Sequence, residues 1–173
     1  MKELLKKINS VQSKFEDITD LKIASLESCL KLLPSTIKQV IDVGYVEKYK
    51  PLYDKYNFEV FSYNLPDYDM HEFDLPCEAV VMRHVLEHSP FPLLVLDKIY
   101  KSLSDKGYLI IIVPKLIKEW ITFAPHFTVL TDEGWRKLFK FCGYNLIHFE
   151  EGIWRDDDLG QEYRYILQKG VTC

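Results

Sequence analysis

The segment from Cys77 to Pro114 constrains the fold most, because it contains a strand, a helix and a second strand in succession. Residues 78–82 form a short Val-rich apolar run, which is typical of a strand buried on both faces of a sheet. After two prolines, apolar residues recur every three or four positions, and Gly107 is expected to end this helix in a left-handed turn. Residues 108–113 form a second apolar run. Two such strands joined through one helix predict a right-handed crossover in a parallel sheet.

Length and composition limit the classes of protein that are compatible with this chain. It has 173 residues, of which 47% are hydrophobic and 28% charged, and this suits one globular domain. A formal net charge of -4 argues against nucleic-acid binding, because an acidic surface repels phosphate. The four cysteines are widely spaced without a CxxC pair, so they indicate neither a zinc knuckle nor a disulfide framework.

The apolar runs are far shorter than the roughly 20 residues that a membrane-spanning helix needs. The N-terminus has no apolar core followed by a small-residue cleavage site. We therefore expect a soluble cytoplasmic protein that does not enter a membrane.

Two amphipathic helical stripes occupy residues 2–33, before Pro34. They predict an N-terminal helical cap over residues 1–34 and a single compact α/β domain over residues 35–173. The cap is expected either to pack on the sheet or to act as a lid or partner-binding arm. A homodimer contact through these helices would fit both interpretations.

Between the cap and Cys77, the pattern predicts a strand over residues 36–44, a short helix over residues 49–57 and an aromatic strand over residues 58–63. Beyond Pro114, Thr131 is expected to cap a helix that Gly143 ends. Two further strands are predicted over residues 144–149 and 163–168.

The sequence Val85-Leu86-Glu87-His88, between an apolar strand and a proline-led amphipathic helix, resembles the second half of class I S-adenosylmethionine-dependent methyltransferases of the LEH-motif type. The resemblance extends over residues 36–169, and further matching positions include Ala79, Val80, Val81, Leu103, Gly107, Pro114, His126, Phe127, Thr128, Thr131 and Gly143. It implies a three-layer α/β sandwich with a mostly parallel, Rossmann-like sheet. The last strand would be antiparallel and would pair between the strands that are fifth and sixth in the family's numbering. S-adenosylmethionine would be the cofactor.

The first half of the chain departs from that family's pattern. Ile41 to Gly44 match its first motif, but residues 45–48 stand where further glycines belong, and Asn64 replaces the acidic residue expected on the ribose. Only about a dozen residues then separate residue 63 from Cys77, so one αβ unit is missing and six strands are expected. We favour residues 58–63 as the family's second strand, with the third strand as the alternative.

The resemblance implies the residues of the cofactor site. Asp67 or Asp69 would reach the adenine, although a solvated acidic loop is the favoured explanation of both residues. His126 is the first candidate for a general base and His84 the second, since a His near neutral pKa suits proton transfer. Each could instead be a hydrogen-bonded structural histidine. The residues expected to bind cofactor are Asp42, Gly44, Tyr45, Asn64, Leu65, Asp69, Arg83, His84 and Val85.

Residues 84–88, HVLEH, also match the HxxEH zinc-protease signature. Two histidines at this spacing face one way only on a helix, whereas here they follow a strand and precede a proline. No metal site is therefore expected. The sequence predicts a methyltransferase that acts on a small-molecule acceptor, and the alternatives are a catalytically inactive binding domain and an enzyme with a pocket rebuilt for another ligand.

Overall fold

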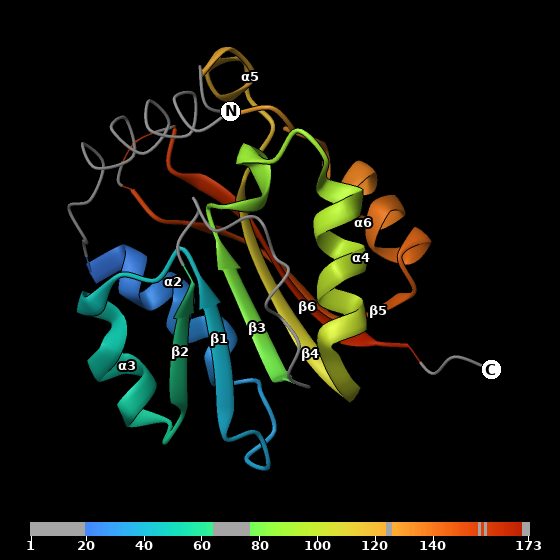
Figure 1. Ribbon diagram of the computed structural model, residues 1–173. Coiled ribbons are helices and arrows are strands. Elements are labelled where there is room, and N and C mark those ends of the chain that lie inside the picture. The colour runs from blue at the N-terminus through green and yellow to red at the C-terminus, as the bar shows by residue number, and fades with distance from the viewer. Residues whose placement is uncertain (1–19, 64–76, 124–125, 156, 158, 171–173) are drawn as a thin grey trace.

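The computed structural model describes residues 20–63, 77–123, 126–155, 157 and 159–170. Six strands form one sheet in the order β2-β1-β3-β4-β6-β5 (Figure 1). They are β1 (Gln39–Val43), β2 (Glu59–Tyr63), β3 (Cys77–Arg83), β4 (Leu103–Pro114), β5 (Tyr144–Ile153) and β6 (Gln161–Lys169). The first four strands pair in parallel, and β6 is antiparallel to both β4 and β5. This confirms the predicted sheet, including the inserted antiparallel strand.

Helices cover both faces of the sheet because the buried strands are apolar on both sides. The helical elements are α2 (Asp20–Leu30), η2 (Glu47–Tyr49), α3 (Lys50–Lys55), η4 (Leu86–His88), α4 (Pro92–Ser102), α5 (Lys118–Thr122) and α6 (Asp132–Phe141). Figure 1 shows α4 with α6 and α2 with α3 at opposite sides of the sheet. The result is the three-layer sandwich expected from the sequence.

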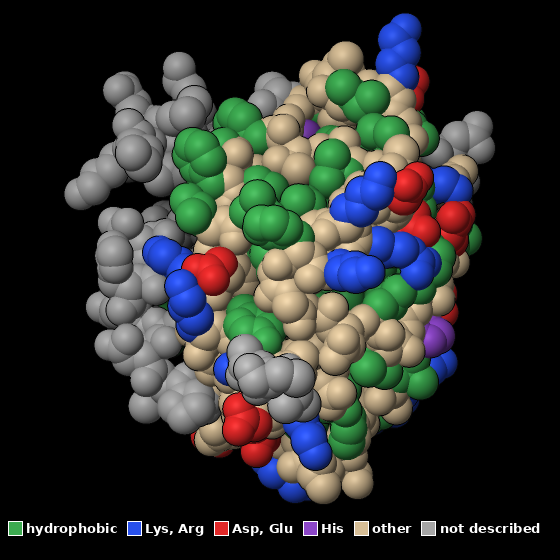
Figure 2. All heavy atoms as spheres, turned by 90° about the vertical axis from the view of Figure 1, so that its right-hand side faces the viewer, with side chains coloured by type: hydrophobic (Ala, Val, Ile, Leu, Met, Phe, Trp, Pro, Cys, Tyr) green, Lys and Arg blue, Asp and Glu red, His purple; other side chains and the backbone are tan. Residues whose placement is uncertain are grey.

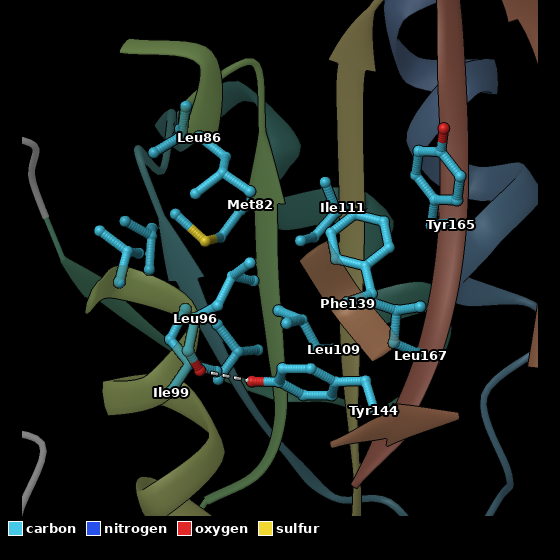
Figure 3. Packing of buried hydrophobic residues seen from close by; sticks show 14 of the residues in the cluster. Met82, Leu86, Leu96, Ile99, Leu109, Ile111, Phe139, Tyr144, Tyr165 and Leu167 are labelled. Carbon is cyan, nitrogen blue, oxygen red and sulfur yellow. Dashed lines mark hydrogen bonds between the residues drawn. The ribbon is translucent and has the colours of Figure 1, made fainter. Parts of the chain in front are cut away.

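Alternate residues of the central strands enter two separate cores. Met82 and Ile111 pack under α4 and α6, whereas Val81 and Ile110 pack under α2 and α3. On the α4 side, the hydroxyl of Tyr144 donates a hydrogen bond of 2.9 Å to the carbonyl oxygen of Leu96 (Figure 3). This bond joins the start of β5 to α4 within the core.

Two turns show where the sequence prediction succeeded and where it failed. Thr131 caps α6 by accepting a hydrogen bond from the Gly134 amide, and Gly143 follows the helix at φ 89°, as predicted. The prediction for Gly107 was wrong, because α4 ends at Ser102 and Lys106 takes the left-handed conformation at φ 62°. Gly107 is required for space instead, since a Cβ there would lie 2.9 Å from the Ser104 carbonyl oxygen.

The first crossover runs from β1 through α3 to β2, which lies at one edge of the sheet. This is the arrangement expected if residues 58–63 form the family's second strand. Residues 64–76, which hold the predicted acidic loop, lie outside the described residues, as do residues 2–15 of the predicted cap. The described part of the cap, α2, buries Leu26 and Leu30 in the core that it shares with the sheet.

Hydrophobic side chains also reach the surface on the side of the molecule that carries α4 and α6. Figure 2 shows them in several groups between basic and acidic side chains. Among the exposed apolar residues are Phe91 and Leu94 at the start of α4 and Phe141 at the end of α6. None of the described helices is long and apolar enough to span a membrane.

Candidate functional site

The carboxyl ends of β1 and β3 meet at Gly44 and Val85. Gly44 has φ 82°, and its amide donates a hydrogen bond of 2.7 Å to the carbonyl oxygen of Tyr63 at the end of β2. A Cβ on Gly44 would lie only 2.8 Å from Cγ2 of Val85. Glycine is therefore required here both by its dihedral angle and by the close approach of the residue that follows β3.

Asp42 is buried one residue before the end of β1 and is only 3% exposed. Its Oδ2 accepts a hydrogen bond of 2.6 Å from the hydroxyl of Tyr53 on α3. Burial raises the pKa of Asp42 from 3.8 to about 7, although the Tyr53 hydrogen bond and the charge of Arg83 both act to lower it. A substantial fraction of this carboxyl group is therefore protonated near neutral pH.

Arg83 and Tyr49 supply unused hydrogen-bond donors beside Asp42. Nε and Nη2 of Arg83 are buried without an acceptor among the described residues, and so is the hydroxyl of Tyr49. Cζ of Arg83 lies 5.5 Å from the centroid of the Tyr49 ring. Because unbonded buried donors are costly, this pair fits a ligand that brings oxygen acceptors, such as a carboxylate.

His84 lies between two buried carboxylates. Its Nε2 is 2.9 Å from Oε2 of Glu162 on β6, and its Nδ1 is 3.5 Å from Oε1 of Glu87. Burial alone would lower the pKa of His84, but the contacts with Glu162 and Glu87 outweigh it and raise that pKa. The pKa of Glu162 falls to about 2, because the bond with His84 and nearby positive charges outweigh its burial.

Glu162 continues this ionic network toward α2. Its Oε1 accepts hydrogen bonds from Ser25 on α2 and, at 2.6 Å, from Nε of Arg164. Arg164 in turn donates from Nη1 to Glu150 on β5 at 2.8 Å. Because Nε2 of His84 is hydrogen-bonded to Glu162 and Nδ1 faces Glu87 at the longer distance of 3.5 Å, the arrangement favours a structural role for that residue.

His126 lies in an aromatic surrounding on the connection after α5. The centroid of its ring is 4.9 Å from that of His88 and 5.3 Å from that of Trp120. Burial lowers the pKa of His126 to about 4, so the imidazole is neutral at pH 7. The amides of Phe127 and Thr128 donate to the carbonyl oxygen of Glu87 at 2.9 and 3.0 Å, which holds this segment against η4.

The predicted site residues are thus partly assembled. The structure brings Asp42, Gly44, Arg83, His84 and Val85 together at the carboxyl ends of neighbouring strands. Tyr45 follows Gly44 and donates its hydroxyl hydrogen to Oε2 of Glu47 at 3.2 Å. Asn64, Leu65 and Asp69 lie outside the described residues, so their predicted roles stay predictions.

Sequence reasoning missed Tyr49, Tyr53 and Glu162. The two tyrosines follow the first motif at helical spacing, and this signal could have placed both of them on the helix beside Asp42. Glu162 is 78 positions from His84, and no local pattern links the two residues. The five-residue HVLEH signature does not form a zinc-protease helix, because β3 ends at Arg83 and residues 86–88 form only a 3-10 turn.

Comparison with known proteins identifies the family. A model described as a methyltransferase domain matches residues 14–149, which is most of the chain. This chain belongs to the methyltransferase domain family. Membership supports S-adenosylmethionine as the methyl donor, the cofactor predicted from the sequence. No match was found among curated proteins.

Solved methyltransferase structures share the fold at low sequence identity. A SAM-dependent methyltransferase from Archaeoglobus fulgidus aligns with a TM-score of 0.67 and 14% identity, over 87% of this chain and 94% of the other. The 1,6-didemethyltoxoflavin-N1-methyltransferase of Burkholderia thailandensis, solved with 1,6-didemethyltoxoflavin and S-adenosylhomocysteine, aligns with a TM-score of 0.69 and 11% identity. That alignment covers 98% of this chain and 86% of the other.

Proposed function

We propose that this methyltransferase-family protein transfers the methyl group of S-adenosylmethionine to a small-molecule acceptor. The observation that carries the proposal is that the buried donors on Arg83 and Tyr49, beside the carboxyl ends of β1 and β3, have no acceptor among the described residues. Open α/β sheets bind their ligands at the carboxyl ends of the strands. The α-carboxylate of the methionine portion would accept hydrogen bonds from these donors.

The same pair explains how the site works with an altered glycine loop. Residues 45–48 carry side chains where the family has further glycines, so fewer backbone amides can approach the charged end of the cofactor. The half-buried guanidinium of Arg83 supplies both positive charge and fixed donors, which would compensate for those amides. We therefore treat the altered loop as a modified binding site that retains cofactor affinity.

S-adenosylmethionine, when bound, supplies an electrophilic methyl group on its sulfonium. The protein's contribution is to bind and orient the reactants for an in-line displacement. Neutral His126 would hold the acceptor by a hydrogen bond, and its low pKa makes it a weak base rather than a strong one. Trp120 and Phe123, with ring centroids 5.6 Å apart, would provide an apolar wall for an aromatic or apolar acceptor.

Three observations support a small molecule as the acceptor. The net charge of -4 disfavours nucleic acid, and aromatic rings surround His126. One structural neighbour binds 1,6-didemethyltoxoflavin together with S-adenosylhomocysteine.

Calorimetry with S-adenosylmethionine and S-adenosylhomocysteine tests the proposal. The unsubstituted protein should bind both, and Arg83→Met should weaken binding by about 10- to 100-fold, since charged hydrogen bonds contribute about 1.5–3 kcal/mol. Arg136→Met is the matched control, because Arg136 lies on α6 and pairs with Asp132 there. No heat at millimolar ligand would refute the enzymatic role. Gly44 is a poor target, because any side chain there clashes with Val85 even without a ligand.

A catalytically inactive binding domain is the second candidate, and the replacement of the loop glycines by residues 45–48 is the observation that favours it. It predicts that neither S-adenosylmethionine nor S-adenosylhomocysteine binds. It also predicts that Arg83→Met raises the thermal stability of the protein without affecting any ligand response, because the substitution removes two buried donors that have no acceptor among the described residues.

A further inference from the structure

A cluster of metal-binding side chains lies beside the proposed methyl-transfer site. Glu87 and His88 come from η4, and His126 comes from the connection after α5. One donor atom from each residue lies within 4.8 Å of the other two. The amides of Phe127 and Thr128 bond the Glu87 carbonyl oxygen, so the backbones of the two segments are fixed relative to each other.

The carboxylate of Glu87 is the strongest indication that a cation belongs here. The residue is 1% exposed, and both of its carboxylate oxygens are buried without a hydrogen-bond donor among the described residues. Nδ1 of His84 lies 3.5 Å and Nε2 of His88 lies 3.9 Å from Oε1 of Glu87, and both distances are too long for strong hydrogen bonds. A buried carboxylate is stable only when it is paired or coordinates a metal.

The imidazole of His126 is oriented as a metal ligand should be. Its Nδ1 lies 3.2 Å from the carbonyl oxygen of Trp120. A carbonyl only accepts hydrogen bonds, so Nδ1 carries the proton and Nε2 keeps a free lone pair. This outer hydrogen bond to a backbone carbonyl is the arrangement that usually fixes the tautomer of a metal-binding histidine.

We propose that Glu87, His88 and His126 bind one divalent transition-metal ion. Two imidazoles and one carboxylate suit zinc or a metal of similar preference, whereas calcium and magnesium favour sets of oxygen ligands. Three protein ligands leave a fourth position open, as in catalytic zinc sites. This site does not use the Arg83 and Tyr49 donors, and its existence does not depend on methyl transfer. It does use Nε2 of His126, so a bound ion would replace the direct hydrogen bond between His126 and the acceptor proposed above.

The ligands need only small movements to bind an ion. Bond lengths of roughly 2.0–2.2 Å in a tetrahedral site place the donor atoms about 3.4 Å apart. The largest separation in the cluster is within 4.8 Å, so closure of about 1.4 Å at most is required. Rotations of the Glu87 and His88 side chains can supply it while the backbone bonds remain in place.

Cobalt(II) is the probe for the experiment, because four-coordinate cobalt absorbs visible light strongly. Protein dialysed against EDTA is titrated with cobalt chloride, and the expected result is a visible spectrum that saturates at one ion per chain and disappears when zinc is added. Glu87→Gln and His126→Asn should each weaken binding at least 10-fold. His148→Asn is the matched control, since His148 lies on β5 outside the cluster and should leave the titration unchanged.

Folding of each variant is checked by thermal unfolding and circular dichroism before titration. Glu87→Gln keeps the shape of the side chain and removes its charge, so a folded variant that no longer binds cobalt supports the site. An unsubstituted protein that shows no saturating cobalt spectrum would overturn the proposal. So would equal losses of affinity in His126→Asn and His148→Asn, because cobalt would then be bound elsewhere.

Discussion

Replacement of Asp42 by Asn should make the protein more stable at alkaline pH. The carboxyl group is 3% exposed and accepts a hydrogen bond from the hydroxyl of Tyr53. Asn has nearly the same shape, its side-chain oxygen can accept the same bond, and it never ionises. The substitution therefore removes the cost of burying a charge while the packing is retained.

The expected magnitude follows from the pKa of Asp42. Burial raises it from 3.8 to about 7. A raised pKa means that the folded state favours the protonated form, so this group's contribution to stability is complete below pH 3.8 and is lost as pH rises to about 7. At about 1.36 kcal/mol per pH unit, the loss reaches about 4 kcal/mol at most.

Urea unfolding, followed by tryptophan fluorescence, measures this difference. The free energy of unfolding of Asp42→Asn minus that of the unsubstituted protein should be near zero at about pH 4. It should increase by roughly 3–4 kcal/mol at about pH 8, with most of the change below pH 7. Titrations of other groups are common to both proteins, so they cancel in the difference.

Asp105→Asn is the control for the loss of one carboxyl group, because Asp105 is exposed on β4. A difference for Asp42→Asn that stays within about 0.5 kcal/mol from acid to alkaline pH would refute the reasoning. It would mean that the carboxylate is ionised in the folded protein without cost. The nearby charge of Arg83 would then outweigh burial.

Three further substitutions test the network, the core and one turn. Glu162→Gln should destabilise the protein by about 3–5 kcal/mol near neutral pH, since it breaks a buried ion pair. Because the pKa of Glu162 is lowered from 4.5 to about 2, this loss of stability should shrink as pH falls below 4.5 in the same urea assay. A loss of stability that does not vary with pH would contradict the prediction. Tyr144→Phe should cost about 1 kcal/mol by leaving the Leu96 carbonyl without its donor, and an unchanged urea midpoint would show that the bond contributes nothing. Lys106→Gly should stabilise the protein by about 0.5 kcal/mol by relieving φ 62°, and a lower melting temperature would contradict the assigned strain.

Local sequence patterns were sufficient to predict the helices and strands and much of the order of the strands in the sheet. Residues 79–82 and 108–113 are apolar on both faces, and this alone requires interior parallel strands with helices on either side. Gly143 could be placed because a helix end with positive φ selects glycine. Gly107 was misplaced because a glycine required for space has the same one-letter signal as a glycine required for its dihedral angle.

Half of the candidate site could also be predicted from local strand patterns. Asp42, Gly44, Arg83 and Val85 each end or follow an apolar strand, and the ends of neighbouring parallel strands meet at one edge of the sheet. The environment of these residues was not predictable. The surroundings of Arg83 depend on residues that approach it from other elements, such as Tyr49, and none of the described residues offers an acceptor to its Nε or Nη2.

The sequence by itself determined a mostly parallel α/β sheet, because strand and helix periodicity are local properties of the chain. The methyltransferase type was implied by the resemblance of residues 85–88 and the other matching positions to that family. Only the tertiary structure decided what HVLEH does. Its spacing fits a zinc helix, but the fold places it at the end of β3, where His84 pairs with Glu162 and His88 contacts His126. Those partners are distant along the chain, and charges that meet only after folding leave no periodic pattern in the sequence.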